Sequence, residues 1–281
     1  MVNAIATIGP ASLCAPAGQR ATFRPMVDSV ANPRTTAAAP AAPRLPWLEH
    51  ACVIVPAYQA ERTLPSVIAE LRGALPGLAN EILVVDDGST DATAQVAMRA
   101  GCQLVSHGRN RGKGAALVTG LATARARGHQ VALTVDADGQ HPADAARSVL
   151  FASTDPEAFV LGVRELATAG APRKNQVSNG ISNFFISRFA GRPLRDTQCG
   201  LRRYPVASTL ALASRGEGYD FEAEVLLRAI WAGLPVVEEP IRVLYPEDRV
   251  THFHVVRDPW RIVRTVVVAL RDRRFGRASP R

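Results

Sequence analysis

The sequence predicts an α/β fold in which a mostly parallel central sheet is flanked by helices. Four short apolar runs alternate with stretches of helical periodicity: CVIVP at 52–56, EILVV at 81–85, CQLVS at 102–106 and VALTV at 131–135. This alternation is typical of doubly wound parallel sheets. With 281 residues, 47% of them hydrophobic and 21% charged, the chain is long enough to bury one large core.

Helical spacing between the runs predicts the first three helices. Apolar residues recur one helical turn apart at Leu64, Ile68, Leu71 and Leu75, and Pro65 stands near the first turn, where its missing N–H is harmless. We expect further helices over about 91–100 and over 112–126.

After residue 150 the alternation loosens. The remaining elements are expected as a strand at 158–163, a helix over 174–190, a helix near 219–233, a short strand near 235–238 and an amphipathic helix near 258–272.

The excess positive charge lies at the two ends of the chain. The net charge is +8, with eight Arg against two Asp in 257–281 and four Arg against one Asp in 1–45. The body between them is close to neutral, so a nucleic-acid-binding surface across it is not expected. Residues 1–45 are rich in Ala, Pro and Thr, which predicts a disordered tail, and Met26 is an alternative start.

The four cysteines give no sign of a metal site or a disulfide framework. They lie far apart and form no CxxC motif or His/Cys cluster, which favours reduced thiols in the cytosol. Cys52 and Cys102 fall in apolar runs and are expected to be buried. No secretory signal and no apolar run of membrane-spanning length is present, so we expect a cytoplasmic protein.

The C-terminal segment 257–281 has two interpretations. Its apolar residues, including Trp260, Val266 and Leu270, are surrounded by arginines. Such a helix fits the surface of an anionic membrane, which predicts peripheral association with the inner face of the cytoplasmic membrane. It equally fits a helix that packs on the body and leaves its arginines in water.

Asp136 and Asp138 follow the fourth apolar run and are separated by one alanine. In extended chain, residues i and i+2 point the same way, so both carboxylates can face one ligand. Hard oxygen ligands of this kind suit Mg²⁺ or Mn²⁺ shared with substrate phosphates, and Gln140 can add another oxygen. As a bare pattern, the pair also fits a solvated turn.

Two further polar segments follow predicted strands. In Asp86–Asp91, one of Ser89, Thr90 or Asp91 is expected to cap the next helix, which leaves an aspartate for a nucleobase or ribose. Residues 108–114, GRNRGKG, open the third helix and resemble a phosphate-binding loop with Lys113 beside it, although the sequence is not a Walker A motif. A glycine-rich connection with a solvated lysine is the alternative.

The ordered set of motifs is more specific than any one of them. PAYQAE (56–61), VVDDGSTD (84–91), GRNRGKGAAL (108–117) and VDADGQHP (135–142) together resemble family 2 of the GT-A glycosyltransferases. Further stretches are similar to the dolichol-phosphate mannose and undecaprenyl-phosphate sugar synthases: GVR (162–164), DTQCGLRRY (196–204), GYDFEAEVLLRA (218–229) and GLPVVEEPIRVLYP (233–246). The resemblance implies one Rossmann-like GT-A domain over 46–256, with a nucleotide-binding half of about 46–140 and an acceptor half of about 141–256.

The resemblance also implies roles for individual residues. Those expected around the donor nucleotide are Pro56, Tyr58, Val85 and Asp87, with Glu61 displaced from the family's usual Asn-Glu-Glu stretch. Those expected at the metal and diphosphate are Asp136, Ala137, Asp138 and Gln140, while Arg164 and Arg173 match phosphate-binding arginines.

The family points to a metal-dependent, inverting transfer from a UDP- or GDP-sugar to polyprenyl phosphate, with Asp138 and Arg164 at the reacting groups. If the acceptor is instead a hydroxyl of a lipid, polysaccharide or small molecule, Asp196 is the best candidate for the base; a structural carboxylate is its alternative role. A nucleotide-binding module without catalysis is a third alternative.

The chain departs from the family at one further place. His252 and His254 replace a usual Gly-x-Ser-Lys stretch, where they are either structural or close to the metal or the acceptor phosphate.

Overall fold

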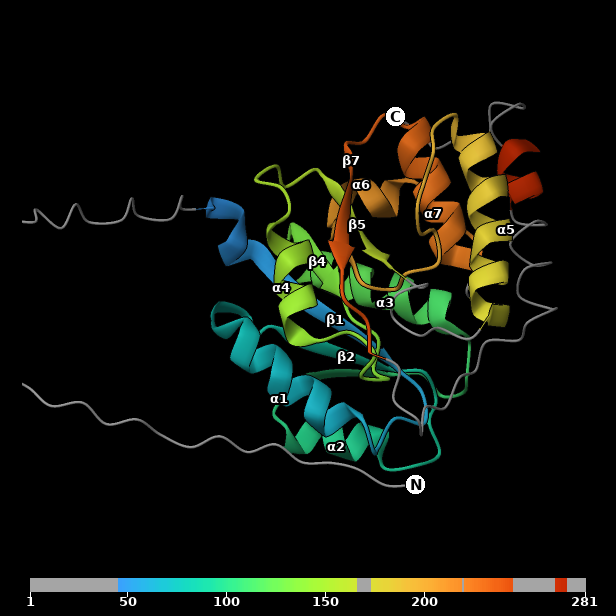
Figure 1. Cartoon of the computed structure of the whole chain (residues 1–281). Helices are drawn as coiled ribbons and strands as arrows, with labels where there is room; N and C mark the ends of the chain where they lie inside the picture. Colours follow the sequence, from blue (N-terminus) through green and yellow to red (C-terminus); the bar gives the residue numbers. More distant parts are fainter. Residues whose placement is uncertain (1–44, 166–172, 219, 245–265, 272–281) are drawn as a thin grey trace, which may run out of the picture. The chain divides into compact units, whose positions relative to one another are not determined.

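The computed structural model describes residues 45–165, 173–218, 220–244 and 266–271, all within one compact unit, Arg44–Arg281. Seven strands form one sheet in the order β3-β2-β1-β4-β6-β5-β7 (Figure 1). The strands are β1 Ala51–Ala57, β2 Ile82–Asp86, β3 Gln103–Ser106, β4 Val131–Thr134, β5 Phe159–Arg164, β6 Arg202–Pro205 and β7 Val236–Ile241. The predicted tail 1–45, apart from Leu45, and the histidines His252 and His254 lie outside the described residues.

Strands β1 to β4 form the parallel half of the sheet. β1 pairs with β2 and with β4, which places Val55 opposite Val84 and Ile54 opposite Thr134. β2 in turn pairs with β3. The helices that connect these strands are α1 Leu64–Ala74, α2 Thr93–Arg99 and α3 Lys113–Ala126. The predicted alternation is confirmed, and the carboxyl ends of these strands meet at one edge of the sheet.

The second half contains an antiparallel strand that the sequence pattern did not predict. β6 lies between β4 and β5 and runs antiparallel to both, with Arg202 opposite Thr134 and Arg203 opposite Val160. β5 and β7 are parallel and confirm the strands expected at 158–163 and 235–238. The helices of this half are α4 Ala143–Phe151, α5 Arg173–Ala190, α6 Val206–Ala211 and α7 Asp220–Trp231, and short 3-10 helices cover Pro46–His50 and Pro76–Leu78.

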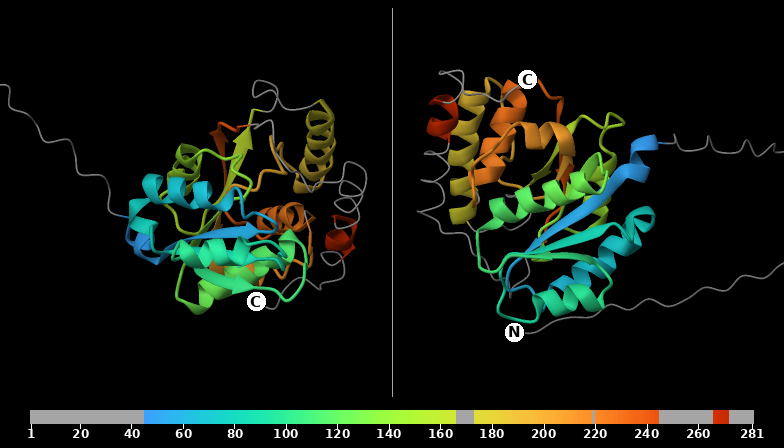
Figure 2. Two further views of the ribbon diagram at one scale, coloured as in Figure 1. Left: turned by 90° about the horizontal axis from the view of Figure 1, so that it is seen from below. Right: turned by 180° about the vertical axis from the view of Figure 1, so that it is seen from behind.

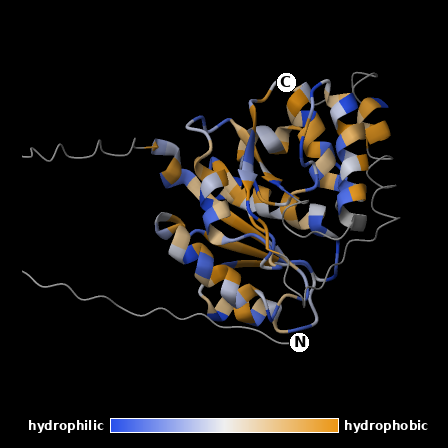
Figure 3. Cartoon of the chain, in the orientation of Figure 1, coloured by the Kyte–Doolittle hydropathy of each residue, from blue (hydrophilic) through white to orange (hydrophobic). Residues whose placement is uncertain are grey.

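Helices cover both faces of the sheet (Figures 1 and 2). α1 packs beside α2 and α4, whereas α3 packs beside α6 and α7, and α5 packs against α7. The hydrophobic strands at the centre stand out in Figure 3. A Cβ on Gly120 of α3 would lie 2.5 Å from Ile54 Cγ2, so this glycine lets the helix approach the sheet closely.

The described cysteines are free thiols, as expected from the sequence. Cys52 is buried, and its burial raises the pKa of the thiol to about 12, while Cys102 is only half-buried. Cys199 is buried as well, with a pKa raised to about 12 by the same cause.

Only residues 266–271 of the predicted C-terminal amphipathic helix are described. They are helical, and Val266 and Ala269 are buried against the body. This part of the segment therefore packs on the protein. Among the residues described, no helix combines the length and apolar character needed to cross a bilayer.

Candidate functional site

The polar segments predicted from the sequence converge at the carboxyl ends of β1, β2 and β4. Asp87 N donates a hydrogen bond of 2.8 Å to Ala57 O, at the end of β1, and Val135 N donates one of 3.0 Å to Ile54 O. Parallel pairing thus brings the segments after three strands to the same edge, where ligands bind in folds of this class.

Asp136 pairs with Lys113 at the centre of this edge. Lys113 Nζ lies 2.7 Å from Asp136 Oδ1 and 3.0 Å from Glu222 Oε1, the latter on α7. Burial of the Asp136 carboxyl opposes ionisation, but the Lys113 ammonium and other nearby cations outweigh it and lower the pKa of Asp136. The carboxylate is therefore ionised at neutral pH. Lys113, predicted as a phosphate-binding residue, reaches the site through this ion pair.

Two residues of this cluster were missed at the sequence level. Glu222 is buried within α7, in the stretch GYDFEAEVLLRA, which the resemblance included without a role for this residue. A Cβ on Gly200 would lie 2.3 Å from Asp136 Oδ2 and 2.6 Å from Lys113 Nζ. Gly200 is the central residue of DTQCGLRRY, so the motif was noticed but its need for a glycine was not. Only this residue type leaves room for the ion pair.

The loop after β4 is fixed at several points. Asp138 Oδ1 accepts a hydrogen bond of 3.0 Å from Gln140 N, and Ala137 O accepts one of 2.6 Å from Thr63 Oγ1. Gln140 O accepts another from Leu244 N, at 2.8 Å. The loop is thus anchored to the start of α1 and to the segment after β7, which holds both carboxylates at the edge of the sheet.

The residues of this loop fit a hard divalent cation. Asp136, Asp138 and Gln140 supply only oxygen atoms, the ligands that Mg²⁺ and Mn²⁺ prefer. His141 is buried, and desolvation lowers its pKa to about 4, so the imidazole is neutral. Within the described residues no three His, Cys, Asp or Glu side chains cluster as a closed metal site. The set suits a cation that completes its shell with substrate oxygens.

Asp87 anchors the glycine-rich loop. Its Oδ1 lies 2.6 Å from His107 Nδ1 and accepts a hydrogen bond of 2.9 Å from Arg111 N, and its Oδ2 accepts one of 2.8 Å from Gly112 N. Because a carboxylate only accepts, His107 Nδ1 carries a proton, and His107 Nε2 lies 3.0 Å from the Thr119 hydroxyl. The carboxylate expected at the nucleotide is thus buried and shared with the loop.

Part of the expected phosphate-binding loop at 108–114 is engaged in contacts with the protein itself. Two of its N–H groups donate to Asp87, and Ala115 N donates to Glu217 O at 3.1 Å. A Cβ on Gly112 would lie 2.3 Å from Glu217 O, and one on Gly114 would lie 2.5 Å from Gly216 O. The glycines therefore allow a second stretch of backbone to cover the helix N-terminus, where an anion was expected.

The segment after β1 is bound to the segment before α2. Glu61 is exposed, and its Oε2 accepts a hydrogen bond of 2.8 Å from Ala92 N. The N-cap residue of α2 is Ala92 and not one of the three expected residues, but Asp91 Oδ1 accepts a hydrogen bond of 3.0 Å from Thr93 N and so satisfies a donor of the first turn. In this arrangement Glu61 holds the start of α2.

The other residues expected at the nucleotide lie on or just after β1 and β2. Pro56 and Val85 are opposite each other in the sheet, and Tyr58 follows β1 and is half-buried. The Val85 side chain lies against Gly120 of α3, 3.3 Å from where a Cβ would stand. The Val85 side chain therefore belongs to the core. The backbone of Val85 pairs with the neighbouring strand.

Arg164 and Asp196 form a buried ion pair at the end of β5. Arg164 Nε lies 2.7 Å from Asp196 Oδ2, and Arg164 Nη2 lies 3.0 Å from Asp196 Oδ1. Asp196, which is fully buried, also accepts from Arg164 N at 3.1 Å and from Gln198 N at 3.2 Å. Both carboxylate oxygens are engaged by donors, which favours a positioning role over that of a base. Arg173 begins α5, and its side chain lies outside the described residues.

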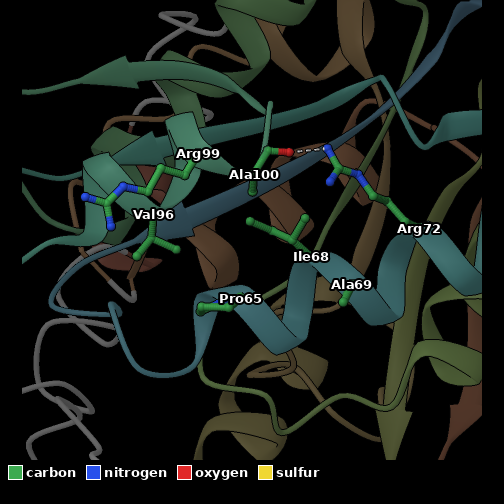
Figure 4. Close-up of a pocket in the computed structure, with 7 residues that line it drawn as sticks. All are labelled: Pro65, Ile68, Ala69, Arg72, Val96, Arg99 and Ala100. Carbon is green, nitrogen blue, oxygen red and sulfur yellow. Dashed lines mark hydrogen bonds between the residues drawn. The ribbon is translucent and has the colours of Figure 1, made fainter.

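A separate pocket of ≈ 320 Å³ lies between α1 and α2 (Figure 4). Its lining consists of Pro65, Ile68, Ala69, Arg72, Val96, Arg99 and Ala100, and Arg72 Nη2 donates to Ala100 O at 2.6 Å. None of these residues is a predicted site residue, and the lining offers no acid. The chemistry is therefore concentrated at the edge of the sheet.

The sequence is similar to those of known proteins. The family model described as Glycosyl transferase family 2 matches residues 52–207. An uncharacterized protein of Methanocaldococcus jannaschii is 32% identical over 69% of this chain and 82% of its own length. A UDP-N-acetylglucosamine–dolichyl-phosphate N-acetylglucosaminyltransferase of Methanococcus voltae is 28% identical over 69% and 86%. A polyprenol monophosphomannose synthase of Mycolicibacterium smegmatis is 29% identical over 67% and 75%.

Solved structures agree with the fold. Mannosyl-3-phosphoglycerate synthase from Rubrobacter xylanophilus superimposes with a TM-score of 0.60 at 24% identity, over 82% of this chain and 76% of that one. Glucosyl-3-phosphoglycerate synthase from Mycobacterium tuberculosis, in complex with Mn²⁺, UDP-glucose and phosphoglyceric acid, gives 0.63 at 19% identity, over 83% and 85%. At such identities the likeness concerns the fold alone, and it is the GT-A fold expected from the sequence. With its motifs, its sheet and the family match in agreement, the chain belongs to glycosyl transferase family 2 and is a glycosyltransferase.

Proposed function

We propose that the protein transfers a sugar from a nucleotide-sugar, UDP- or GDP-linked, to polyprenyl phosphate, with Mg²⁺ or Mn²⁺ and with inversion at the anomeric carbon. The observation that carries the proposal is the Asp136–Lys113 pair at the carboxyl ends of the parallel strands, next to Asp138 and Gln140. The names of the Methanococcus and Mycolicibacterium relatives support a lipid-phosphate acceptor. Inversion comes from the family resemblance.

In this proposal the loop after β4 holds the donor's leaving group. Asp136, Asp138 and Gln140 bind the metal ion, which when present stabilises the negative charge that grows on the departing diphosphate. Lys113 supplies a further positive charge at the same place, and Arg164 and Arg173 bind phosphate oxygens. Pro56, Tyr58, Ala137 and the backbone at Val85 flank the nucleotide, with Asp87 fixing the loop beside it.

The arrangement of Asp196 favours a phosphate acceptor over a hydroxyl. A hydroxyl must lose its proton during the attack, whereas a phosphate oxygen is already ionised at neutral pH. Because both Asp196 oxygens accept hydrogen bonds, four in all, Asp196 is poorly placed to take a proton. The acceptor phosphate oxygen then forms the new bond to the anomeric carbon, and the bond from that carbon to the nucleoside diphosphate breaks.

The acceptor places the protein at the cytoplasmic face of a membrane. Polyprenyl phosphate is held in the bilayer by its hydrocarbon chain, while nucleotide-sugars are water-soluble, so the enzyme must work where the two meet. We therefore propose peripheral association with the membrane, to which the basic segment 257–281 contributes. No nucleic-acid partner is proposed.

The test is a transfer assay with purified full-length protein, Mn²⁺ or Mg²⁺, a panel of UDP- and GDP-sugars and short-chain polyprenyl phosphate in detergent. We expect metal-dependent glycolipid with one donor and none from Asp138→Asn, a variant of the same shape without the charge. Transfer only to a hydroxyl acceptor would replace the polyprenyl phosphate part of the proposal. Binding of a nucleotide-sugar without turnover of any donor would support the nucleotide-binding module instead.

A further inference from the structure

Helix α5 buries two polar residues and exposes several apolar ones, although Ile186 on its inner side belongs to the core. Asn179 and Ser182, both polar, are among its buried residues, whereas Val177 and Phe184 are 62% and 67% exposed. Surface helices of soluble proteins usually bury their apolar stripe and expose the polar one. Among the described residues, no apolar neighbour covers these side chains on the outward side of α5.

The exposed apolar side chains share one side of the helix. They are Val177, Ile181, Phe184 and Phe185, which we call the α5 face. Their spacing of four, three and one residues keeps them on adjacent turns. Phe184 and Phe185 make an edge-to-face contact with ring centroids 5.5 Å apart, so the two rings form one continuous apolar surface. Figure 3 shows the hydrophobic residues of α5 among its polar ones.

The charge of α5 and of the residues directly after it has a single sign. Residues 173–195 contain five Lys or Arg and no Asp or Glu. Arg188, one turn beyond Phe184, and Arg192 are exposed, whereas Arg195 lies 3.6 Å from Glu238 in an ion pair. A surface that combines exposed aromatics with exposed arginines fits a partner that is apolar inside and negatively charged outside.

The opposite side of α5 is tied to the candidate site. Gln198 Nε2 donates to Ser182 Oγ at 2.9 Å, and Thr197 N donates to Asn183 Oδ1 at 2.8 Å. Thr197 and Gln198 are the two residues after Asp196, which pairs with Arg164. A surface that docks through α5 is thus connected, by one layer of side chains, to the arginine proposed to bind phosphate.

We propose that the α5 face docks on a lipid bilayer that contains anionic phospholipids. The apolar side chains enter the boundary between headgroups and acyl chains, and the arginines pair with lipid phosphates. A second copy of this chain fits less well, because a twofold contact would bring the arginines of two α5 helices together. The inference rests on the proposed function and extends it, because docking through α5 would place the candidate site next to the membrane that contains the acceptor.

Vesicle flotation with the full-length protein, without donor or metal, tests the docking. We expect binding to phosphatidylcholine vesicles that contain phosphatidylglycerol, weaker binding to phosphatidylcholine alone, and a fall in binding as salt rises. The variant Val177→Ser/Phe184→Ser should bind the anionic vesicles about tenfold more weakly. Met98→Ser is the matched control, because Met98 is also exposed, at 57%, but lies on α2.

Transfer to a short-chain, water-soluble polyprenyl phosphate separates this inference from the proposed function. The double variant should keep wild-type transfer to that acceptor while losing transfer to long-chain acceptor in vesicles. Equal flotation of wild type and double variant would overturn the inference, even if transfer is seen. A wild-type protein that does not bind anionic vesicles, and that light scattering shows to be a dimer while the double variant is a monomer, would also overturn it.

Discussion

Lys113 Nζ lies 2.7 Å from Asp136 Oδ1, so the first carboxylate of the candidate metal loop already holds a cation from the protein itself. Glu222 Oε1, 3.0 Å from the same ammonium, offers Lys113 a second partner. A metal ion at Asp136 and the ammonium compete for one carboxylate, whereas a diphosphate bound beside them would attract both. We therefore expect the pair to couple metal binding to the presence of the donor.

Removal of the Lys113 charge should separate metal binding from nucleotide binding. We expect Lys113→Met to bind Mn²⁺ alone on the order of tenfold more tightly, because Asp136 loses its competitor, and to bind UDP alone more weakly. Calorimetry of each ligand measures both effects. Since Lys113→Met leaves Glu222 buried without its partner, Lys113→Met/Glu222→Gln is measured beside it. Weaker binding of both ligands by both variants would show that Lys113 only supports the fold.

Gly200→Ala should damage the site far more than the fold. The new Cβ would meet Asp136 Oδ2 at 2.3 Å and Lys113 Nζ at 2.6 Å, so the ion pair must move. We expect a loss of kcat of at least about tenfold, since a small misplacement at a reacting centre is costly. Gly180→Ala is the control: nothing lies within 4 Å of its Cβ, and in a helix it should add up to about 1 kcal/mol of stability. Equal activity of the two variants would remove Gly200 from the site.

Loss of one partner of the Arg164–Asp196 pair should destabilise the fold more than loss of both charges. Asp196→Asn leaves a guanidinium without its bidentate partner, and we expect unfolding in urea to become easier by about 3 kcal/mol. The double variant Arg164→Met/Asp196→Asn should regain part of that loss, because no unpaired charge then remains. A stable Asp196→Asn protein whose only defect is a loss of transfer to hydroxyl acceptors would instead identify Asp196 as a base.

Arg203 is expected to be structural. Its guanidinium is buried, donates to Leu150 O at 2.9 Å and to Ser153 O at 2.6 Å, and stands 5.0 Å from the centroid of the Trp47 ring. Arg203→Met should lower the free energy of unfolding by about 3 kcal/mol, because several carbonyls lose their donor. Arg147→Met, which removes an exposed arginine 5.1 Å from the Phe151 ring, should cost about 0.5 kcal/mol in the same experiment. Equal losses would contradict the assignment.

The fold could be predicted where apolar periodicity is strong and not where buried polar residues form an element. The runs at 52–56 and 131–135 became β1 and β4, because aliphatic residues covered on both faces of a parallel sheet form a continuous signal. β6 has the sequence Arg202-Arg203-Tyr204-Pro205, which gives no such signal. Its two arginines are buried and donate hydrogen bonds to backbone carbonyls far away in the sequence, among them those of Glu222 and Leu150. A local sequence pattern cannot reveal such distant partners.

In the candidate site, too, the residues with a local sequence signal could be predicted, and those that depend on distant contacts could not. Asp136 and Asp138 were predicted because carboxylates directly after a strand reach the binding edge of the sheet. At Gly112 and Gly114 the sequence could not show that a neighbouring backbone comes close, because a glycine that admits a phosphate and one that admits a backbone look alike in sequence. Gly200 and Glu222 come from segments 64 and 86 residues beyond Asp136. Only the antiparallel return of β6 and the position of α7 bring them to it.

The measurement that tests the central claim most directly is ³¹P NMR of the lipid product formed by the full-length protein with its preferred nucleotide-sugar, metal and polyprenyl phosphate. We predict that the phosphate monoester signal of the acceptor is replaced by that of a phosphodiester, coupled to the anomeric proton of the sugar. A product in which the monoester persists and the sugar is attached to a hydroxyl would contradict the claim.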